Sequence, residues 1–117
     1  MKRVLCDNNV PRALAVYLGS MYVVTEARKR GWARTENGDL LNAGEDAGFD
    51  VLLTADKKMR HQQNFTGRKI AVVVLGSQEW ELIEAYVERV IAAIDAATPG
   101  KVDPVPIPLP PKKPYQG

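Results

Sequence analysis

The chain is poor in cysteine and histidine, with a single residue of each among 117. One cysteine, Cys6, cannot form a disulfide within the chain, and no grouping of cysteine and histidine has the spacing of a zinc site. Long apolar runs are missing too. The longest, residues 70–75, is far shorter than a membrane span, and the apolar stretch behind Lys2 and Arg3 is too short for a signal peptide. We therefore expect a protein without membrane association, in the reducing environment of the cytoplasm.

Proline is almost absent from residues 1–98, where Pro11 is the only one of the eight in the chain. The same residues carry equal numbers of basic and acidic side chains, so the net charge of +2 belongs to the rest. These differences divide the chain into a neutral domain, residues 1–98, and a proline-rich tail, residues 99–117. Proline alternates with apolar residues in the tail, which favours an extended strand. Two alternatives stay open: a disordered tail, or a tail that lies on a surface of its own or a neighbouring chain.

Short apolar runs alternate with helical patterns through the neutral domain, which is typical of a parallel sheet covered by helices. The last apolar run has no polar position, as expected of a strand that is buried on both faces. The fold class predicted is α/β, with a short parallel sheet of about four strands. The strands are expected at residues 3–7, 22–25, 50–54 and 70–75, with helices after the first strand, before the third, and over residues 78–95.

Three aspartates are expected at one edge of this sheet. Asp7 ends the first strand, Asp56 follows the third by two residues, and Asp39 begins the helix before the third. The edge at the strand carboxyl ends is where parallel sheets bind ligands, and the three acids share it if the first and third strands are neighbours. Converging carboxylates repel one another unless a cation lies between them, which suggests Mg²⁺ or Mn²⁺, and Asn8 and Asn9 add neutral oxygens for metal or phosphate. The alternative is local: Asp39 caps its helix and Asp56 begins a turn.

Basic residues gather in two windows from which acids are missing. One surrounds Trp32, and the other follows Asp56. We expect both in loops at the carboxyl edge, as a basic rim that binds phosphodiester groups around an acidic centre. Trp32 would stack on an unpaired base; the alternative is that it covers the edge of the core and the basic residues are solvated. The windows hold Arg28, Lys29, Arg30 and Arg34, then Lys57, Lys58, Arg60, Arg68 and Lys69. The residues assigned to nucleic-acid binding are Asn8, Asn9, Trp32, Arg34, Lys57, Lys58 and Arg60.

Three segments resemble successive motifs of the compact PIN-like proteins, relatives of PIN-domain toxins and of the carboxy-terminal ribonuclease domain of the Mut-seven proteins. The segments are residues 5–11, 37–41 and 50–56, with Asp7, Asp39 and Asp56. The resemblance excludes the tail. It implies a three-layer α/β/α, Rossmann-like domain whose acids bind Mg²⁺ or Mn²⁺ and cleave RNA, often as the toxin of a toxin–antitoxin pair. Many relatives carry glutamate directly after the first aspartate, where this chain has Asn8, so one carboxylate of the family's set is missing.

The first hypothesis is therefore a metal-dependent endoribonuclease, with RNA as substrate and a small antitoxin protein as partner. The alternative is a catalytically inactive PIN-like module that forms a homodimer or binds a small partner through the tail. A phosphate-accepting receiver domain is disfavoured, because it needs a second acid beside Asp7 and a lysine after the last strand. His61 is expected in a surface loop, and Cys6 in the core. Glu36 is the further candidate for a metal ligand if Asn8 leaves a coordination position empty.

Overall fold

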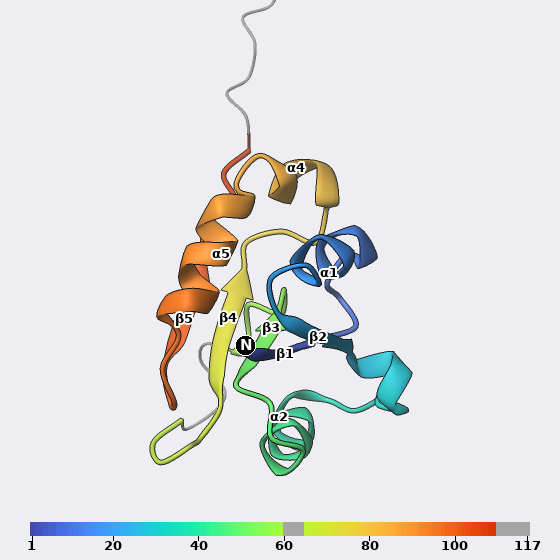
Figure 1. Ribbon diagram of the computed structural model, residues 1–117, viewed down its shortest axis with the longest axis vertical. Helices are drawn as coiled ribbons and strands as arrows, with labels where there is room; N and C mark the ends of the chain where they lie inside the picture. The colour runs from blue at the N-terminus through green and yellow to red at the C-terminus, as the bar shows by residue number, and fades with distance from the viewer. Residues whose placement is uncertain (60–64, 110–117) are drawn as a thin grey trace, which may run out of the picture.

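The computed structural model describes residues 1–59 and 65–109, which form an α/β fold on a five-stranded sheet (Figure 1). The strand order is β2-β1-β3-β4-β5, and every neighbouring pair is parallel. The predicted α/β class with a parallel sheet is confirmed. The strands are β1 (Arg3–Cys6), β2 (Val23–Glu26), β3 (Val51–Thr54), β4 (Ala71–Leu75) and β5 (Val102–Val105).

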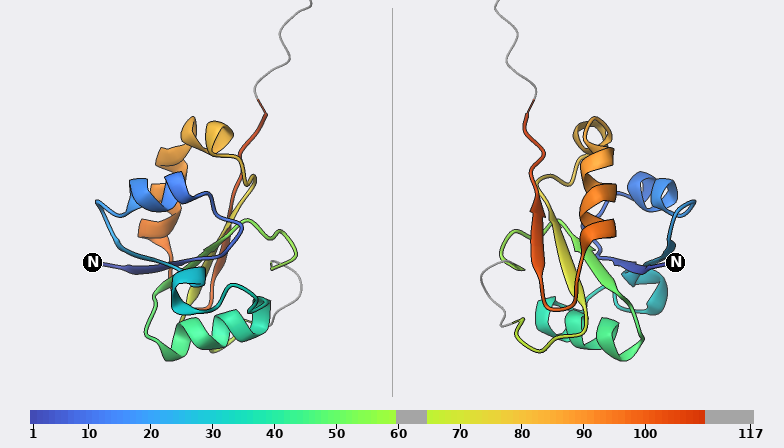
Figure 2. Two further views of the ribbon diagram at one scale, coloured as in Figure 1. Left: turned by 90° about the vertical axis from the view of Figure 1, so that its right-hand side faces the viewer. Right: turned by 60° about the vertical axis from the view of Figure 1, so that its left-hand side comes forward.

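Helices cover both faces of the sheet (Figure 2). One face carries α1 (Arg12–Leu18), α4 (Trp80–Glu84) and α5 (Val87–Ala96), and the other carries the 3₁₀ helix η1 (Ala27–Arg30) and α2 (Asn37–Asp46). Side chains of β3 alternate between the two cores: Val51 and Leu53 pack on the α1 side, and Leu52 packs on the α2 side. Every residue of β3 and β4 is buried, which is why β4 is apolar at every position and β3 at every position except its last, Thr54.

The predicted helix over residues 78–95 is interrupted and forms α4 and α5. The interruption lies at Tyr86, whose N–H donates to the Ile83 carbonyl three residues back, at 2.8 Å. Both parts still bury the predicted apolar stripe against the sheet, through Ile83 in α4 and through Val90 and Ile94 in α5. The periodicity therefore located the buried face correctly but did not reveal the break in the backbone.

The largest difference from the sequence expectations concerns the tail. Residues 102–105 pair with β4 as an edge strand, with Val72 opposite Val102 and Leu75 opposite Val105 (Figure 2, right). The sheet therefore has five strands rather than about four, and the division drawn after residue 98 falls inside the fold. The chain reaches β5 through a turn in which Gly100 has a φ of 79°. The last tail residues, 110–117, lie outside the described residues.

Candidate functional site

Asp7 and Asp56 stand at the carboxyl ends of two adjacent strands. Asp7 directly follows β1, and Asp56 follows β3 by two residues. The two strands pair with Cys6 opposite Leu53, and the Asp7 N–H extends the ladder by donating to the Leu53 carbonyl at 2.9 Å. The predicted adjacency of the first and third strands is confirmed, and both acids therefore lie at the same edge of the sheet.

The hydroxyl of Thr54 joins these two acids. Thr54 ends β3, and 0% of its surface is exposed. Its hydroxyl donates to Asp7 Oδ2 at 2.7 Å and accepts from the Asp56 N–H at 3.1 Å. The second oxygen of Asp7, Oδ1, accepts from the Asn8 N–H at 2.7 Å. Two donors therefore hold the Asp7 carboxylate in one orientation, and one of them comes from the protein interior.

Asn8 and Asn9 tie the loop after β1 to its neighbours. The Asn9 side-chain oxygen accepts from the Ala55 N–H at 2.9 Å, which joins this loop to the one after β3. The Asn8 side-chain amide donates to the carbonyls of Trp32 and Ala33 at 3.2 and 3.0 Å, which joins it to the loop after η1. Sequence reasoning assigned both asparagines to nucleic-acid binding. In the structure each side chain makes contacts that shape the edge of the sheet around Asp7.

Asp56 begins a turn, as the local alternative expected. Its Oδ1 accepts from the Lys58 N–H at 2.9 Å, and its carbonyl accepts from the Met59 N–H at 3.1 Å. The turn buries Met59 in the core on the α2 side and leaves Lys57 and Lys58 exposed. Lys57 and Lys58, which the sequence predicts to bind phosphate, therefore lie on the surface directly after Asp56. Arg60 and His61 lie outside the described residues.

Asp39 is not drawn into a cluster with the other two acids. It lies in the first turn of α2 and is exposed, because the next two residues, Leu40 and Leu41, turn into the core on that face of the sheet. Among residues 1–59 and 65–109, no group of three or more histidine, cysteine, aspartate or glutamate side chains is arranged to hold a metal ion. The described residues therefore do not bring Asp7, Asp39 and Asp56 together as one group of three ligands.

The basic window around Trp32 is partly occupied by contacts within the fold. Arg28 and Lys29 pair with Glu26 at 2.6 and 3.1 Å, and the hydrogen bond from Arg28 is the main reason that the pKa of Glu26 is lowered although burial opposes it. The Arg30 guanidinium lies 4.8 Å from the centre of the Trp32 ring. Trp32 itself is half-buried and packs edge-on against Phe49 at 6.5 Å. Its contacts are those of a residue that covers the edge of the core, with Arg30 rather than a base against its ring.

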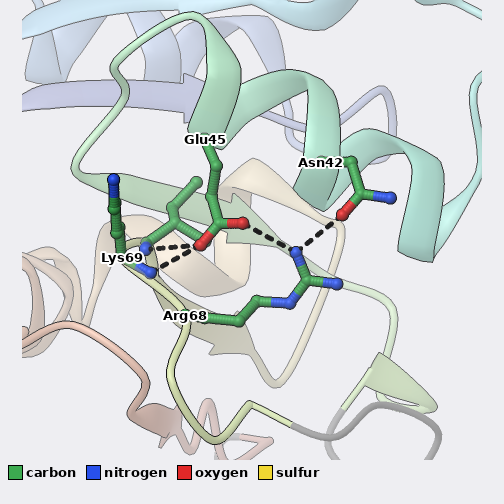
Figure 3. A network of polar contacts seen from close by, with 5 residues as sticks. Asn42, Glu45, Arg68 and Lys69 are labelled. Carbon is green, nitrogen blue, oxygen red and sulfur yellow. Dashed lines mark hydrogen bonds and ion pairs between the residues drawn. The ribbon is translucent and has the colours of Figure 1, made fainter.

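The second basic window does not lie wholly at the carboxyl edge, contrary to expectation. Arg68 and Lys69 precede β4 and therefore lie at the opposite, amino-terminal edge (Figure 3). Arg68 Nη1 donates to Glu45 Oε1 and Asn42 Oδ1, both at 2.9 Å, and the Lys69 N–H donates to Glu45 Oε2 at 2.5 Å. The expected rim at the carboxyl edge thus loses Arg68 and Lys69.

The Glu45 carboxylate is stabilised as an anion by this network. Burial by itself raises its pKa, but hydrogen bonds from the N–H groups of Lys69 and Ile70 and from Arg68 outweigh it and lower the pKa below 4.5. At the carboxyl edge, the exposed basic residues that make no ion pair within the described part of the chain include Lys57, Lys58 and Arg34.

Two features of this edge escaped sequence reasoning. Thr54 lies within the motif of residues 50–56, but its place there does not reveal that its hydroxyl connects the Asp7 carboxylate with the backbone N–H of Asp56. Glu26 was not singled out, yet it is a nearly buried carboxylate at the end of β2, opposite Cys6 in the pairing register. Burial, together with the charges of Glu26 and Asp7, raises the pKa of the Cys6 thiol to about 12, which keeps it protonated and unreactive. The signal for Glu26 was its position as the first polar residue after an apolar strand.

Comparisons were made with models of protein families, with curated proteins and with solved structures, and none of the three gave a match. No helix in residues 1–59 and 65–109 combines the length and the apolar character needed to cross a bilayer. The candidate site therefore rests on its own geometry: a buried threonine hydroxyl joins the Asp7 carboxylate to the backbone of Asp56, and exposed lysines follow Asp56.

Proposed function

We propose that the protein is a metal-dependent endoribonuclease of the PIN-like type, with Asp7 and Asp56 holding Mg²⁺ or Mn²⁺. One observation carries the proposal: the two aspartates follow adjacent parallel strands, and the Thr54 hydroxyl donates to the Asp7 carboxylate while it accepts from the backbone N–H of Asp56. Neither carboxylate forms an ion pair within residues 1–59 and 65–109, so neither is neutralised by a lysine or arginine there. A divalent cation is a ligand that this arrangement suits.

The donor set fits such a cation. From the described residues, each Asp7 oxygen accepts one hydrogen bond, from Thr54 or from Asn8, which leaves a lone pair for a further partner. Asp56 uses Oδ1 for the Lys58 N–H, and its Oδ2 takes no hydrogen bond from the described residues. Mg²⁺ commonly binds through one or two carboxylates and fills its remaining positions with waters and substrate phosphate oxygens. Two aspartates are therefore sufficient for a site that is completed by the substrate.

The residues around the carboxylates have separable roles in this proposal. When bound, the cation lowers the pKa of a coordinated water and offsets the charge that develops on the scissile phosphate. Thr54 and the Asn8 N–H hold Asp7 in the orientation that the metal requires. Lys57 and Lys58 bind the phosphates on either side of the scissile bond, because they are exposed on the turn that carries Asp56. Arg34 extends this contact from the loop that Asn8 holds.

The resemblance to PIN-domain toxins extends the proposal to a biological role, in which the chain is the toxin of a toxin–antitoxin pair and a small protein blocks the edge around Asp7. Expression of the wild-type chain then slows growth, and Asp7→Asn expression does not. Equal growth inhibition by the two forms at equal protein levels would contradict the toxin role.

The test of the enzyme compares three aspartate variants. Asp7→Asn is expected to lower the cleavage of single-stranded RNA under Mn²⁺ by roughly 100-fold or more, and to remove Mn²⁺ binding in calorimetry. Asp46→Asn is the matched control, because Asp46 is exposed at the far end of α2. Asp39→Asn should behave like this control, given the exposed position of Asp39. Cleavage by Asp7→Asn at the rate of the Asp46 variant would refute the assignment.

A second candidate, the catalytically inactive module, is favoured by one observation. No group of three or more histidine, cysteine, aspartate or glutamate side chains that could hold a metal ion is found in the described residues. This candidate expects association through the tail. Deleting residues 99–117 would remove β5 from the sheet, so the truncation must follow Leu109 instead. A complex lost on that truncation, together with no Mn²⁺ binding at millimolar concentration, would support the module over the enzyme.

A further inference from the structure

A groove of about 370 Å³ lies where the tail passes the carboxyl ends of β4 and β5. Its walls are residues 74–76 and 104–108, and Lys57 stands at its rim. All of the wall residues are apolar or glycine, so Lys57 is the one charged side chain among the described residues that lines the groove. Lys57 directly follows Asp56, and the groove therefore begins beside the candidate metal site.

The groove depends on a close approach between Gly76 and the tail. The Gly76 N–H donates to the Val105 carbonyl at 2.9 Å, and a Cβ at Gly76 would lie only 2.7 Å from the Ile107 nitrogen. Val105 and Ile107 are buried against the core, which turns the intervening Pro106 outward. The tail is thus held against β4, and its exposed prolines form one wall of the groove.

The chemistry of the wall selects among possible occupants. An extended peptide that adds a strand to a sheet edge needs outward N–H groups, and Pro104 and Pro106 have none. A flat apolar ring needs no such groups and binds by contact with the exposed proline rings, because the valine and leucine residues behind them are buried. Lys57 at the rim suits an anion attached to that ring. A nucleobase with its phosphate combines these two properties, and the volume lies near the lower end of the roughly 300–1,000 Å³ of small-molecule sites.

We propose that this groove is a nucleobase subsite for single-stranded RNA, occupied by the base of a nucleotide next to the one cleaved at Asp7 and Asp56, with Lys57 on its phosphate. The proposal rests on the proposed ribonuclease function, and it gives the tail a role in that function. Apolar contact with a base discriminates weakly between sequences, because every base has an apolar face. The groove therefore raises affinity for single strands without selecting one sequence.

The test measures RNA binding without catalysis, in buffer that contains EDTA. A fluorescent oligouridylate and an oligomer of the same length that lacks all bases are titrated against the full chain. The wild-type protein should bind the base-containing strand at least about fivefold more tightly, which is the ratio that corresponds to one contacted base. Equal affinity for the two strands, or no binding of either, would overturn the proposal.

Matched variants locate the effect. Pro106→Asp places a charge in the groove at an exposed position and should bring the ratio of the two affinities close to one, whereas Pro99→Asp, outside the groove, should leave it unchanged. Lys57→Gln should lower the affinity for both RNA oligomers by the same factor. Lys101→Gln, at the other end of β5, should leave both affinities unchanged. Retention of the wild-type ratio by Pro106→Asp would refute the subsite. If Pro106→Asp does not fold, Pro108→Asp replaces it, because Pro108 is also an exposed part of the wall.

The outcomes separate this inference from the proposed function. A base-dependent ratio in a protein that cleaves no RNA would leave the groove as a binding site and exclude the nuclease. Metal-dependent cleavage of RNA, together with equal affinities for the oligomers with and without bases, would support the nuclease function and exclude the nucleobase subsite.

Discussion

Replacing Thr54 by valine should destabilise the fold and disable the candidate site together. Valine keeps the shape of the side chain, so the change removes only the hydroxyl. The lost bond to the Asp7 carboxylate, at 2.7 Å, belongs to the class with a charged partner, which is worth about 1.5–3 kcal/mol. The bond from the Asp56 N–H, at 3.1 Å, adds roughly 0.5–1.5 kcal/mol. Asp7 and Asp56 are half-buried, so water replaces part of this, and we expect a loss of about 2–3 kcal/mol in the free energy of unfolding.

The assay is urea unfolding, with Thr54→Ser as the matched control. With a urea dependence of about 2 kcal/mol/M, the midpoint of Thr54→Val should fall by roughly 1–1.5 M. Thr54→Ser keeps the hydroxyl and loses one methyl group, at a cost of about 1 kcal/mol. RNA cleavage should follow the hydroxyl rather than the stability: the serine variant retains it, and the valine variant loses it even well below its unfolding midpoint. A valine variant at least as stable and as active as the serine variant would refute the role given to the hydroxyl.

Three further predictions concern the framework of the site. The pKa of Glu45 is lowered below 4.5 in the folded protein, so its contribution to the free energy of unfolding is complete above pH 4.5 and is lost as the pH falls through the folded pKa. The difference in urea midpoint between wild type and Glu45→Gln should therefore shrink between pH 7 and pH 3. A constant difference would contradict this. The pKa of Tyr22 is raised by burial and by its hydrogen bond to Asp95, so its contribution to the free energy of unfolding is complete below the unfolded pKa of 10.0 and declines above it. The urea midpoints of wild type and Tyr22→Phe should therefore converge between pH 8 and pH 11. Gly76→Ala should lower thermal stability by about 1–3 kcal/mol, because its Cβ meets the Ile107 nitrogen at 2.7 Å. An unchanged melting temperature would show that the tail is not held against Gly76.

Much of the sheet could be predicted because burial on two faces leaves an unambiguous pattern. β4 is apolar at every position and β3 at every position except Thr54, and all residues of both strands are buried. Asp7 and Asp56 could be located at the carboxyl edge for a related reason: each is the first acid after such a run. The predicted ends of the strands differ from the observed ones by a residue at most positions, since pairing rather than composition decides where a strand stops.

The remaining site residues depend on contacts between segments that are distant in sequence. Asp39 is exposed because the burial of Leu40 and Leu41 sets the rotation of α2, and no local signal reports that rotation. Arg68 was placed in a free basic window because its acidic partner, Glu45, lies 23 residues away in the chain. A basic window without acids is therefore weak support for a nucleic-acid surface until the acids that fold against it are known.

The tail shows how a pattern can exclude one structure and still specify another. In a parallel strand, alternate residues direct both backbone groups toward the neighbouring strand. The carbonyls of Lys101 and Val105 accept from Val72 and Gly76, so the odd-numbered residues of the tail face β4. Pro104 and Pro106 are even-numbered, and the N–H groups that they lack would point away from the sheet. A shift of one residue would turn Pro104 and Pro106 toward β4, and the N–H donors at those two positions would be missing from the ladder. Alternating prolines thus argue against an interior strand but are compatible with an edge strand whose prolines face away from the sheet. The missing N–H groups on the outer side also keep a further strand from pairing there. Proline content alone favoured a separate tail; the parity of the proline positions is the property that agrees with the fold.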